Sequence, residues 1–228
     1  RLSRKDDILM TGKRHDFKAD YKVGYADDGK ILGIEVDLAA RCGYSLDLSK
    51  AIVSRALFHA DNAYFLPNAT FRGFLCKTNT ASNTAFRGFG GPQGMLAIEN
   101  IIEEIAMNIG VDPLEVRKLN YYQKETNNVT PYDQVVKDNI INELSSELIE
   151  DSKYLARRQS IENFNKNNKY LKKGLAFSPV KFGISFTTQL LNQAGALVNV
   201  YKDGSIYINH GGTEMGQGLF IKDAQVVA

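Results

Sequence analysis

In Ser82-Asn83-Thr84-Ala85-Phe86-Arg87-Gly88-Phe89-Gly90-Gly91-Pro92-Gln93-Gly94, a polar turn is followed by one Arg between two Phe and then by glycines that run into a helical pattern. Glycine lets a backbone N–H approach a ligand closely, and the N-terminus of a helix directs such donors at an anion. The stretch therefore suggests a site for an anionic or phosphate-bearing cofactor with aromatic rings beside it.

Length and composition narrow the class of protein. The chain has 228 residues, 43% of them hydrophobic, which fits one large or two smaller packed domains. A formal charge of +2, with basic residues scattered among acidic ones, argues against a nucleic-acid surface. No apolar run approaches the roughly 20 residues of a membrane span, and no signal-peptide pattern opens the chain. The first residue, Arg1, and the end soon after a second glycine-rich loop suggest a piece of a longer protein.

Cys42 and Cys76 are the only cysteines, and they form no C-x-x-C unit. This spacing argues against a disulfide scaffold, a zinc ribbon or an iron–sulfur cluster bound by this chain alone. A reducing, cytoplasmic setting fits such sparse cysteine use.

The first third of the chain has the pattern of a hairpin. Residues 1–18 are polar and rich in turn formers. Alternating apolar residues then flank an Asp-Gly turn, at Tyr21, Val23 and Tyr25 before it and at Ile34, Val36, Leu38 and Ala40 after it. Residues 51–59 are expected to form a short helix or buried segment, and residues 71–78 a strand that leads to the glycine-rich loop.

The helix after this loop has the clearest pattern in the chain. Apolar residues recur every three or four positions, at Met95, Ile98, Ile102, Ile105 and Ile109. The acidic residues of the same segment are expected to be solvated surface, namely Glu99, Glu103 and Glu104. Gly110 suits the end of the helix, and Asp112-Pro113-Leu114-Glu115 predicts the start of the next one, with Asp as the cap.

The second half repeats this order of parts without repeating the sequence. Residues 123–135 resemble a connection, and two polar helices are expected at about 138–149 and 151–165. A hairpin follows at 196–208, then His210-Gly211-Gly212-Thr213-Glu214-Met215-Gly216-Gln217-Gly218 and a helix from Leu219, in which Asp223 stands where an apolar residue is expected. The pattern predicts an α+β protein of two mixed α/β subdomains, 1–125 and 126–228, whose glycine-rich loops grip a cofactor from both sides.

Common catalytic motifs are absent from the sequence. It contains no G-x-x-x-x-G-K-[ST], no G-x-G-x-x-G and no G-x-S-x-G. The three histidines, His15, His59 and His210, lack the spacing of a zinc hydrolase, and His59 and His210 are interpreted as structural. A glycine-rich turn by itself is more often plain structure. Two such loops, with Arg87 and Gln217 as donors inside them, favour ligand binding.

Several long stretches resemble the molybdenum-binding domain of the xanthine dehydrogenase/aldehyde oxidase family. They occur in family order and are Thr78–Gly94 with its Ala-Phe-Arg-Gly-Phe-Gly-Gly core, Lys181-Phe182-Gly183-Ile184-Ser185-Phe186-Thr187, Leu191-Asn192-Gln193-Ala194-Gly195-Ala196 and Gly211–Gly218. The resemblance is weakest at 123–172. It implies a molybdopterin-binding fold, with the first subdomain represented by its C-terminal portion and the second one truncated.

The resemblance also implies a substrate pocket. Ser54-Arg55-Ala56-Leu57-Phe58-His59 is similar to the xanthine-oxidising branch, in which Arg55 would hold the carbonyl oxygen of a purine. Phe89 and Phe186 would sandwich the purine ring, and Thr187 would contact it. Without the resemblance, the residues alone favour structural roles. Arg55 would extend from a helix to solvent or pair with Asp61, the two Phe would belong to a core, and Thr187 would be chosen for strand propensity.

The same resemblance assigns residues to the cofactor. Phe86, Arg87 and Gly88 would bind it, and Arg87 would lie at the molybdenum centre through its backbone. In the second loop, Met215, Gly216, Gln217 and Gly218 would surround the pterin and its phosphate.

The implied activity is hydroxylation of a purine, hypoxanthine or xanthine to urate, with water as the oxygen source and a molybdenum–molybdopterin cofactor. The general-base Glu is expected beyond Ala228, so no catalytic residue is assigned and the isolated chain is expected to be inactive. Iron–sulfur clusters and FAD would lie on other domains or subunits of a homo-oligomeric parent, because two separated cysteines hold no cluster. The alternatives are a hydroxylase of aldehydes or of another N-heterocycle, or a non-catalytic scaffold.

Overall fold

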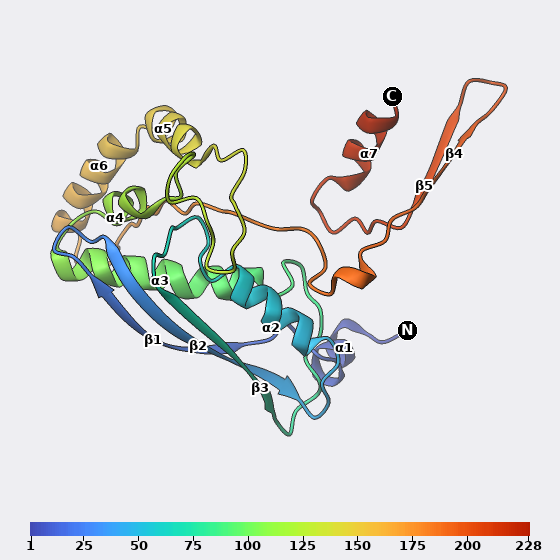
Figure 1. Ribbon diagram of the computed structural model, residues 1–228, viewed down its shortest axis with the longest axis horizontal. Helices are drawn as coiled ribbons and strands as arrows, with labels where there is room; N and C mark the ends of the chain where they lie inside the picture. Colours follow the sequence, from blue (N-terminus) through green and yellow to red (C-terminus); the bar gives the residue numbers. More distant parts are fainter. The chain divides into compact units, whose positions relative to one another are not determined.

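A computed structural model describes residues 1–228 and divides them into two compact units, Arg1–Gly183 and Ile184–Ala228 (Figure 1). The larger unit contains three strands and six helices, and the smaller one contains a hairpin, a 3₁₀ turn and one helix. In chain order the elements are α1 (Arg4–Met10), β1 (Phe17–Tyr25), β2 (Ile31–Gly43), α2 (Ser49–Phe58), β3 (Ala69–Lys77), α3 (Gly91–Ile109), α4 (Pro113–Asn120), α5 (Ile141–Asp151), α6 (Tyr154–Asn167), η1 (Gln189–Leu191), β4 (Ala196–Val200), β5 (Ile206–His210) and α7 (Leu219–Val227).

The larger unit is built on a three-stranded sheet in the order β1-β2-β3. The predicted hairpin is confirmed, because β1 and β2 pair antiparallel, with Tyr21 opposite Val36. The third strand, β3, runs parallel to β2, and α2 makes the crossover between them. The predicted α+β class is thus confirmed, and α2 is held against the sheet by the strands on either side of it in sequence.

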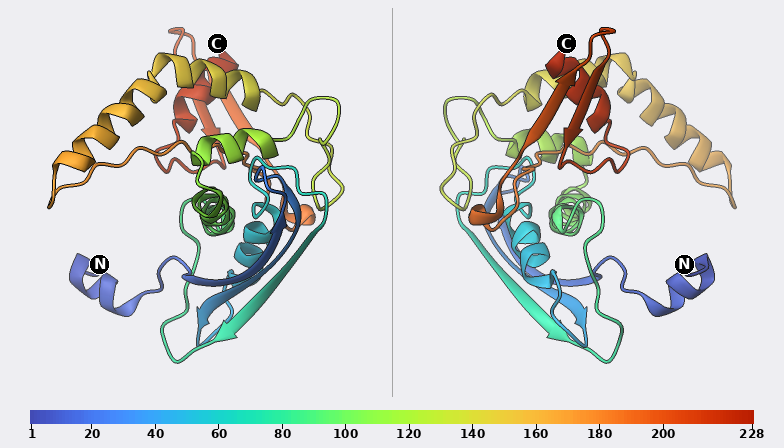
Figure 2. Two further views of the ribbon diagram at one scale, coloured as in Figure 1. Left: turned by 90° about the vertical axis from the view of Figure 1, so that its left-hand side faces the viewer. Right: turned by 90° about the vertical axis from the view of Figure 1, so that its right-hand side faces the viewer.

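One face of the sheet is covered by helices α2 and α3 (Figure 1). Val36 and Leu38 of β2 point into this core together with Ile98, Ile102 and Ile105 of α3. Figure 2 views α3 nearly end-on and shows it between the sheet and α4. The predicted apolar stripe of α3 is confirmed over its middle, and burial of these isoleucines, each worth about 2 kcal/mol of transfer free energy, fixes the helix on the sheet.

The acidic residues of α3 are not all solvated, so that expectation is wrong for Glu99, whose side chain is 13% exposed. The guanidinium of Arg117, on α4, is buried and lies 2.8 Å from a Glu99 oxygen and 2.7 Å from a Glu103 oxygen. Glu99 also accepts hydrogen bonds from the Tyr64 hydroxyl, at 2.6 Å, and from Asn62 Nδ2, at 2.9 Å. Glu99 is therefore a polar anchor between α3, α4 and the turn after α2.

Helix α1 was not expected, because residues 1–18 have no apolar periodicity. Ser3 caps it by accepting the Asp6 N–H at 3.2 Å, and none of its side chains is buried. The end of α3 and the start of α4 follow the sequence signals instead. Gly110 has a φ of 75°, and the Asp112 side chain accepts the Leu114 N–H at 2.9 Å.

The N-terminus of α3 lies directly against the backbone of α2. A Cβ at Gly90 would lie 2.0 Å from the Ile52 carbonyl oxygen, and a Cβ at Gly94 would lie 2.1 Å from the Ala56 carbonyl oxygen. Any side chain at either position would push the two helices apart. Two of the glycines that identify the first loop are thus required by helix packing, whatever else the loop binds.

The smaller unit contains the predicted second hairpin, with β4 and β5 antiparallel and Leu197 opposite Asn209. The unexpected polar residue of α7 has a partner: Asp223 Oδ2 lies 2.8 Å from His210 Nε2. His210 Nδ1 accepts the Gly212 N–H at 3.0 Å, so Nε2 is the protonated nitrogen of the ring. Within residues 1–228, no helix combines the length and apolar character needed to cross a bilayer.

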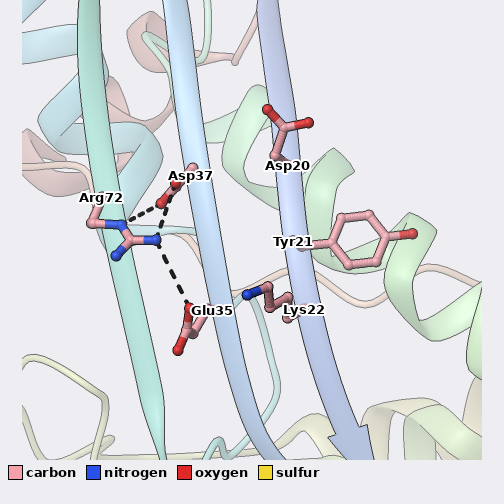
Figure 3. Close-up of a pocket in the computed structure, with 6 residues that line it drawn as sticks. All are labelled: Asp20, Tyr21, Lys22, Glu35, Asp37 and Arg72. Atoms are coloured by element: carbon pink, nitrogen blue, oxygen red, sulfur yellow. Dashed lines mark hydrogen bonds and ion pairs between the residues drawn. The ribbon is translucent and has the colours of Figure 1, made fainter.

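The outer face of the sheet carries a ladder of charges. Figure 3 shows Arg72 of β3 reaching Asp37 and Glu35 of β2, with an Nε–Oδ1 distance of 2.5 Å to Asp37 and an Nη2–Oε2 distance of 3.9 Å to Glu35. The shallow depression here is lined by Asp20, Tyr21, Lys22, Glu35, Asp37 and Arg72. None of the predicted site residues lies among them, and exposed pairs of this kind stabilise a sheet only weakly.

A Gly90→Ala variant tests the contact between α2 and α3. Both the clash with Ile52 and the left-handed φ of 98° oppose an alanine, so we expect a loss of about 3 kcal/mol in the free energy of unfolding, measured with denaturant. Gly110→Ala is the control, because Gly110 also has a positive φ, of 75°, but nothing within 4 Å of its Cβ position. It should cost only about 1 kcal/mol. Equal losses would contradict a steric role for Gly90.

Candidate cofactor and substrate site

The first glycine-rich loop is two overlapping tight turns. The Phe89 N–H donates to the Phe86 carbonyl at 2.8 Å, and the Gly91 N–H donates to the Gly88 carbonyl at 2.9 Å. Gly88, Phe89 and Gly90 have φ values of 93°, 49° and 98°, so three successive residues are left-handed. The N–H groups at the start of α3 are therefore used within the loop, which differs from the expected open anion cradle.

Phe89 has a backbone conformation that a bulky residue rarely adopts. A left-handed φ costs a residue with a Cβ roughly 1–2 kcal/mol, and such strain persists only where the surroundings impose it. Here the flanking turns fix the backbone. The ring of Phe89 lies 5.9 Å from the guanidinium carbon of Arg55, so the loop holds this ring beside the one buried arginine of α2.

Arg55 lies on the buried side of α2, with 5% of its surface exposed. Its Nη1 donates to the carbonyl of Gly183, and its guanidinium carbon lies 5.5 Å from the ring centre of Phe182. Burial lowers the pKa of the guanidinium, which nevertheless stays charged at neutral pH. The structure thus brings together two of the predicted substrate residues, Arg55 and Phe89.

Residues 179–183, which we call the strap, are held by the turn that follows α2. Asn62 Nδ2 donates to the Pro179 carbonyl at 2.9 Å, and Asn62 Oδ1 accepts the Lys181 N–H at 3.1 Å. The ring of Phe182 lies against the first turn of α3, where a Cβ at Gly91 would approach it to 2.5 Å. The strap is therefore part of the larger unit, although it is more than 110 residues away in sequence from the turn that holds it.

Asp61, which the sequence suggests as a partner of Arg55, forms an ion pair with Lys181 of the strap. The Asp61 carboxylate is buried, lies 3.0 Å from Lys181 Nζ and accepts the Tyr122 hydroxyl at 2.7 Å. Burial alone would lower the pKa of Lys181, but the Asp61 carboxylate and the Tyr132 hydroxyl together outweigh it and raise that pKa. Asp61 thus binds the strap, and Arg55 Nη1 donates to the carbonyl of Gly183.

Phe186 and Thr187 belong to the smaller unit. The Asn192 side chain forms two hydrogen bonds with the backbone of Phe186. Its Oδ1 accepts the Phe186 N–H at 2.7 Å, and its Nδ2 donates to the Phe186 carbonyl at 2.8 Å. Asn192 was part of a family-like stretch in the sequence, but no function had been predicted for it. Its function here is to fix the backbone that carries the ring of Phe186.

In the second glycine-rich loop, the backbone N–H groups donate to a carboxylate of the same loop, that of Glu214. Glu214 Oε1 accepts the Gly216 N–H at 2.6 Å, and Oε2 accepts the Leu219 N–H at 2.6 Å at the start of α7. Desolvation alone would raise the pKa of Glu214, but the N–H donors of Gly216, Gly218, Leu219 and Phe220 outweigh it and lower that pKa below its usual value. The N-terminus of α7 is thus occupied by the carboxylate of the protein itself rather than open to a phosphate.

The exposed parts of both loops still suit a polar organic cofactor. Phe86 and Arg87 are exposed, and Arg14 lies over the Phe86 ring at 4.2 Å. In the second loop, Gln217 is exposed and its amide links the Met215 N–H, at 2.6 Å, to the Thr213 carbonyl, at 2.8 Å. A Cβ at Gly218 would meet nothing within 4 Å. Among residues 1–228, no group of three or more His, Cys, Asp or Glu side chains is arranged to hold a metal ion.

Residues 1–121 match the family model described as a molybdopterin cofactor-binding domain, and residues 147–228 match a second model with the same description. The chain belongs to the molybdopterin-binding domain family. The expected family and cofactor class are therefore confirmed. The two matches leave residues 122–146 between them, whereas the compact units meet after Gly183; the division at residue 125 stays a prediction.

Named relatives are similar over the whole chain. The chain is 48% identical over 227 residues to a xanthine dehydrogenase from Dictyostelium discoideum, covering 100% of this chain and 17% of that protein. It is 47% identical over 229 residues to a nicotinate hydroxylase from Emericella nidulans, again covering 100% of this chain and 17% of the relative. The chain thus spans about one sixth of the length of these relatives.

Solved structures share the fold at lower identity. Quinoline 2-oxidoreductase from Pseudomonas putida 86 superposes with a TM-score of 0.79 at 20% identity, covering 100% of this chain and 30% of that one. Aldehyde oxidoreductase from Desulfovibrio gigas gives 0.67 at 24% identity, covering 91% and 22%. The arrangement of strands, helices and glycine-rich loops described above is therefore a known molybdopterin-domain fold.

The residues that sequence reasoning missed are those that hold the site. No function was predicted for four residues that hold the loops or the strap, namely Asn62, Phe182, Asn192 and Glu214. His59 was interpreted only as structural, and its hydrogen bonds to Arg55 and Gly183 agree with that. Their signals were weak: His59 follows Arg55 by four residues, one turn of helix, and Asn192 and Glu214 stood inside stretches quoted for their resemblance.

The backbone strain at Phe89 predicts that a glycine variant is more stable than an alanine variant at this position. Phe89→Gly and Phe89→Ala both remove the ring, but only glycine tolerates the left-handed φ of 49°, so the glycine variant should be more stable by about 1 kcal/mol. The free energies of unfolding of the two variants test this. The same pair at Leu96, exposed on α3, should give the opposite order, because alanine favours a helix by about 1 kcal/mol. The same sign at both sites would contradict the strain.

The carboxylate of Glu214 should control the start of α7. Because its pKa is lowered in the folded chain, its stabilisation is complete above the ordinary Glu pKa of about 4.3 and is lost as the pH falls through the lowered value. Glu214→Gln should remove it at neutral pH, seen as faster hydrogen exchange of the Leu219 and Phe220 amides. Asp203→Asn, which affects only the β4–β5 turn through Ser205, is the control. Unchanged exchange at Leu219 would refute this function.

Proposed function

We propose that this chain supplies part of the cofactor and substrate site of a molybdenum hydroxylase that oxidises purines such as hypoxanthine and xanthine. The observation that carries the proposal is the buried guanidinium of Arg55, held next to the ring of Phe89 by the Gly183 carbonyl. A buried cation beside an aromatic face suits a flat heterocycle that carries carbonyl oxygens.

Arg55 would act on the charge of the substrate. When a nucleophile adds to a purine carbon, negative charge spreads over the ring to its carbonyl oxygens. A fixed guanidinium stabilises that charge best in a site from which water is excluded, and Arg55 has only 5% of its surface exposed. Phe89, and Phe186 with Thr187 in the smaller unit, would contact the ring and fix its orientation.

The cofactor would be held mainly by backbone. We propose that Phe86, Arg87 and Gly88 of the larger unit contact it, with the Arg87 backbone at the molybdenum centre. From the smaller unit, Met215, Gly216, Gln217 and Gly218 would contact the pterin. Glu214 would shape this second loop, since its carboxylate already accepts the N–H groups of Gly218 and Leu219 that a phosphate would otherwise use. When bound, the cofactor would supply the two-electron acceptor and the activation of water.

The remaining parts of the enzyme would lie outside these residues. We propose that iron–sulfur clusters, FAD and the general-base Glu belong to other regions of a homo-oligomeric, cytoplasmic parent. Cys42 and Cys76 are both free thiols, which fits a reducing compartment. The 228-residue chain alone should then show no xanthine turnover, and turnover by the purified chain would overturn this assignment.

A second candidate is hydroxylation of an N-heterocycle that carries a carboxylate, as in nicotinate. It is favoured by the same residue, because a guanidinium pairs with a carboxylate through two parallel hydrogen bonds. The 47% identity to a nicotinate hydroxylase, against 48% to a xanthine dehydrogenase, does not separate the two. An aldehyde, by contrast, offers Arg55 no remote oxygen.

Arg55→Met in the full-length parent tests the proposal. Purine turnover should fall about 10²–10³-fold in kcat/KM, because a charge-assisted hydrogen bond to the developing negative charge is lost, while aldehyde turnover stays within about threefold. Arg72→Met, which removes an exposed arginine on the outer face of the sheet, is the control and should change neither.

Steady-state kinetics with xanthine, nicotinate and a simple aldehyde separate the candidates. A selective loss with xanthine supports the purine function, and a selective loss with nicotinate supports the second candidate. Equal losses with all three substrates would contradict a substrate contact by Arg55.

A further inference from the structure

His59, the residue that follows α2, connects Arg55 to the strap. Its Nδ1 lies 2.8 Å from the carbonyl oxygen of Arg55, and its Nε2 lies 3.0 Å from the backbone nitrogen of Gly183. The carbonyl of the same Gly183 accepts Nη1 of Arg55. The three residues therefore form a closed ring of hydrogen bonds in which Gly183 is held at both its N–H and its carbonyl.

The partners of His59 fix its protonation. A backbone N–H can only donate, so Nε2 must be the unprotonated acceptor, and Nδ1 must carry the proton that it donates to the Arg55 carbonyl. Burial lowers the pKa of this imidazole, and so do two nearby cations, Arg55 and Lys181, the second of which is paired with Asp61. His59 is thus a neutral, buried imidazole with one fixed tautomer.

We propose that His59 is a positioning residue for Arg55: through the Gly183 peptide it holds the carbonyl that orients the guanidinium. This proposal deepens the proposed function and rests on Arg55 contacting substrate. A guanidinium is planar, so one directed acceptor at Nη1 restrains the orientation of the whole group. The tilted ring of Phe182, 4.7 Å from the imidazole centre, packs against the same side chain and keeps the strap in place.

Loss of the His59 imidazole should affect the turnover of some substrates and not of others. Without the imidazole acceptor, the Gly183 N–H loses its partner and the strap can shift, which misplaces the acceptor of Arg55. A misplaced Arg55 would stabilise the developing charge less well and so slow turnover of substrates that use it, while a substrate with no contact to Arg55 would be turned over as before. A general loss of folding would instead affect every substrate equally.

The test uses the full-length parent with His59→Leu and His59→Gln. Leucine fills the space without an acceptor, whereas the Gln Oε1 can reach the position of Nε2. We expect kcat/KM for the Arg55-dependent substrate to fall about tenfold in His59→Leu, mainly through kcat, because Arg55 stabilises charge that develops in the transition state. In His59→Gln it should return to within about threefold of wild type. kcat/KM for an aldehyde should not change in either variant.

His15→Leu is the matched control. It also removes a buried imidazole, but one that bonds Ser49 Oγ, at 2.7 Å, rather than the strap. It should leave kcat/KM for both substrates within about twofold, even where stability falls. An equal fall in kcat/KM in His15→Leu, or no fall in His59→Leu, would overturn the proposal.

Hydrogen exchange of the Gly183 amide gives a readout that needs no substrate. It should become faster in His59→Leu, recover in His59→Gln and stay unchanged in His15→Leu. If exchange behaves so but no variant differs in any kcat/KM, His59 holds the strap without affecting catalysis and the positioning proposal fails. If exchange and kcat/KM change together, but for a substrate other than a purine, His59 still positions Arg55 and only the proposed purine specificity fails.

Discussion

The close contact between the backbones of α2 and α3 is the constraint on which the site depends. Gly90 and Gly94 allow α3 to begin against the carbonyls of Ile52 and Ala56. Arg55 lies between these two residues on α2, and Phe89 immediately precedes the α3 cap. The contact that packs the two helices therefore also sets the distance between the guanidinium and the aromatic ring. Gly90 and Gly94, which in the sequence suggest ligand binding, are required first by this packing.

Polar contacts, rather than apolar burial, hold the strap. Asn62, Asp61 and His59 supply its hydrogen-bond and ion-pair partners, and all three are buried. Buried polar groups are costly unless they are paired, so such a network tolerates few alternative arrangements. An apolar contact would hold the strap as tightly but with less directional precision, and the precision matters because Gly183 presents its carbonyl to Arg55.

Local signals predicted local structure. Turn residues predicted the β1–β2 hairpin, periodicity predicted the apolar stripe of α3, and capping residues predicted the start of α4 at Asp112. Each of these signals lies within about ten residues of sequence. Helix α1 was missed because it buries nothing, and Glu99 was misjudged because its partner Arg117 lies 18 positions away. The ring of His59, Arg55 and Gly183 spans more than 120 residues and has no local pattern at all. Arg55 and Phe89 themselves were predicted only through a family resemblance.

Both glycine-rich loops lead into a helix, but they satisfy the N–H groups of that helix in different ways. The N–H groups at the start of α3 donate to carbonyls of the loop itself, whereas those at the start of α7 donate to a carboxylate, Glu214. A helix N-terminus satisfied in either way has little left to offer a phosphate. Glycines before a helix therefore do not by themselves predict an anion site. The residues that we propose for the cofactor lie ahead of the helix starts, around Arg87 and Gln217, whose side chains are exposed.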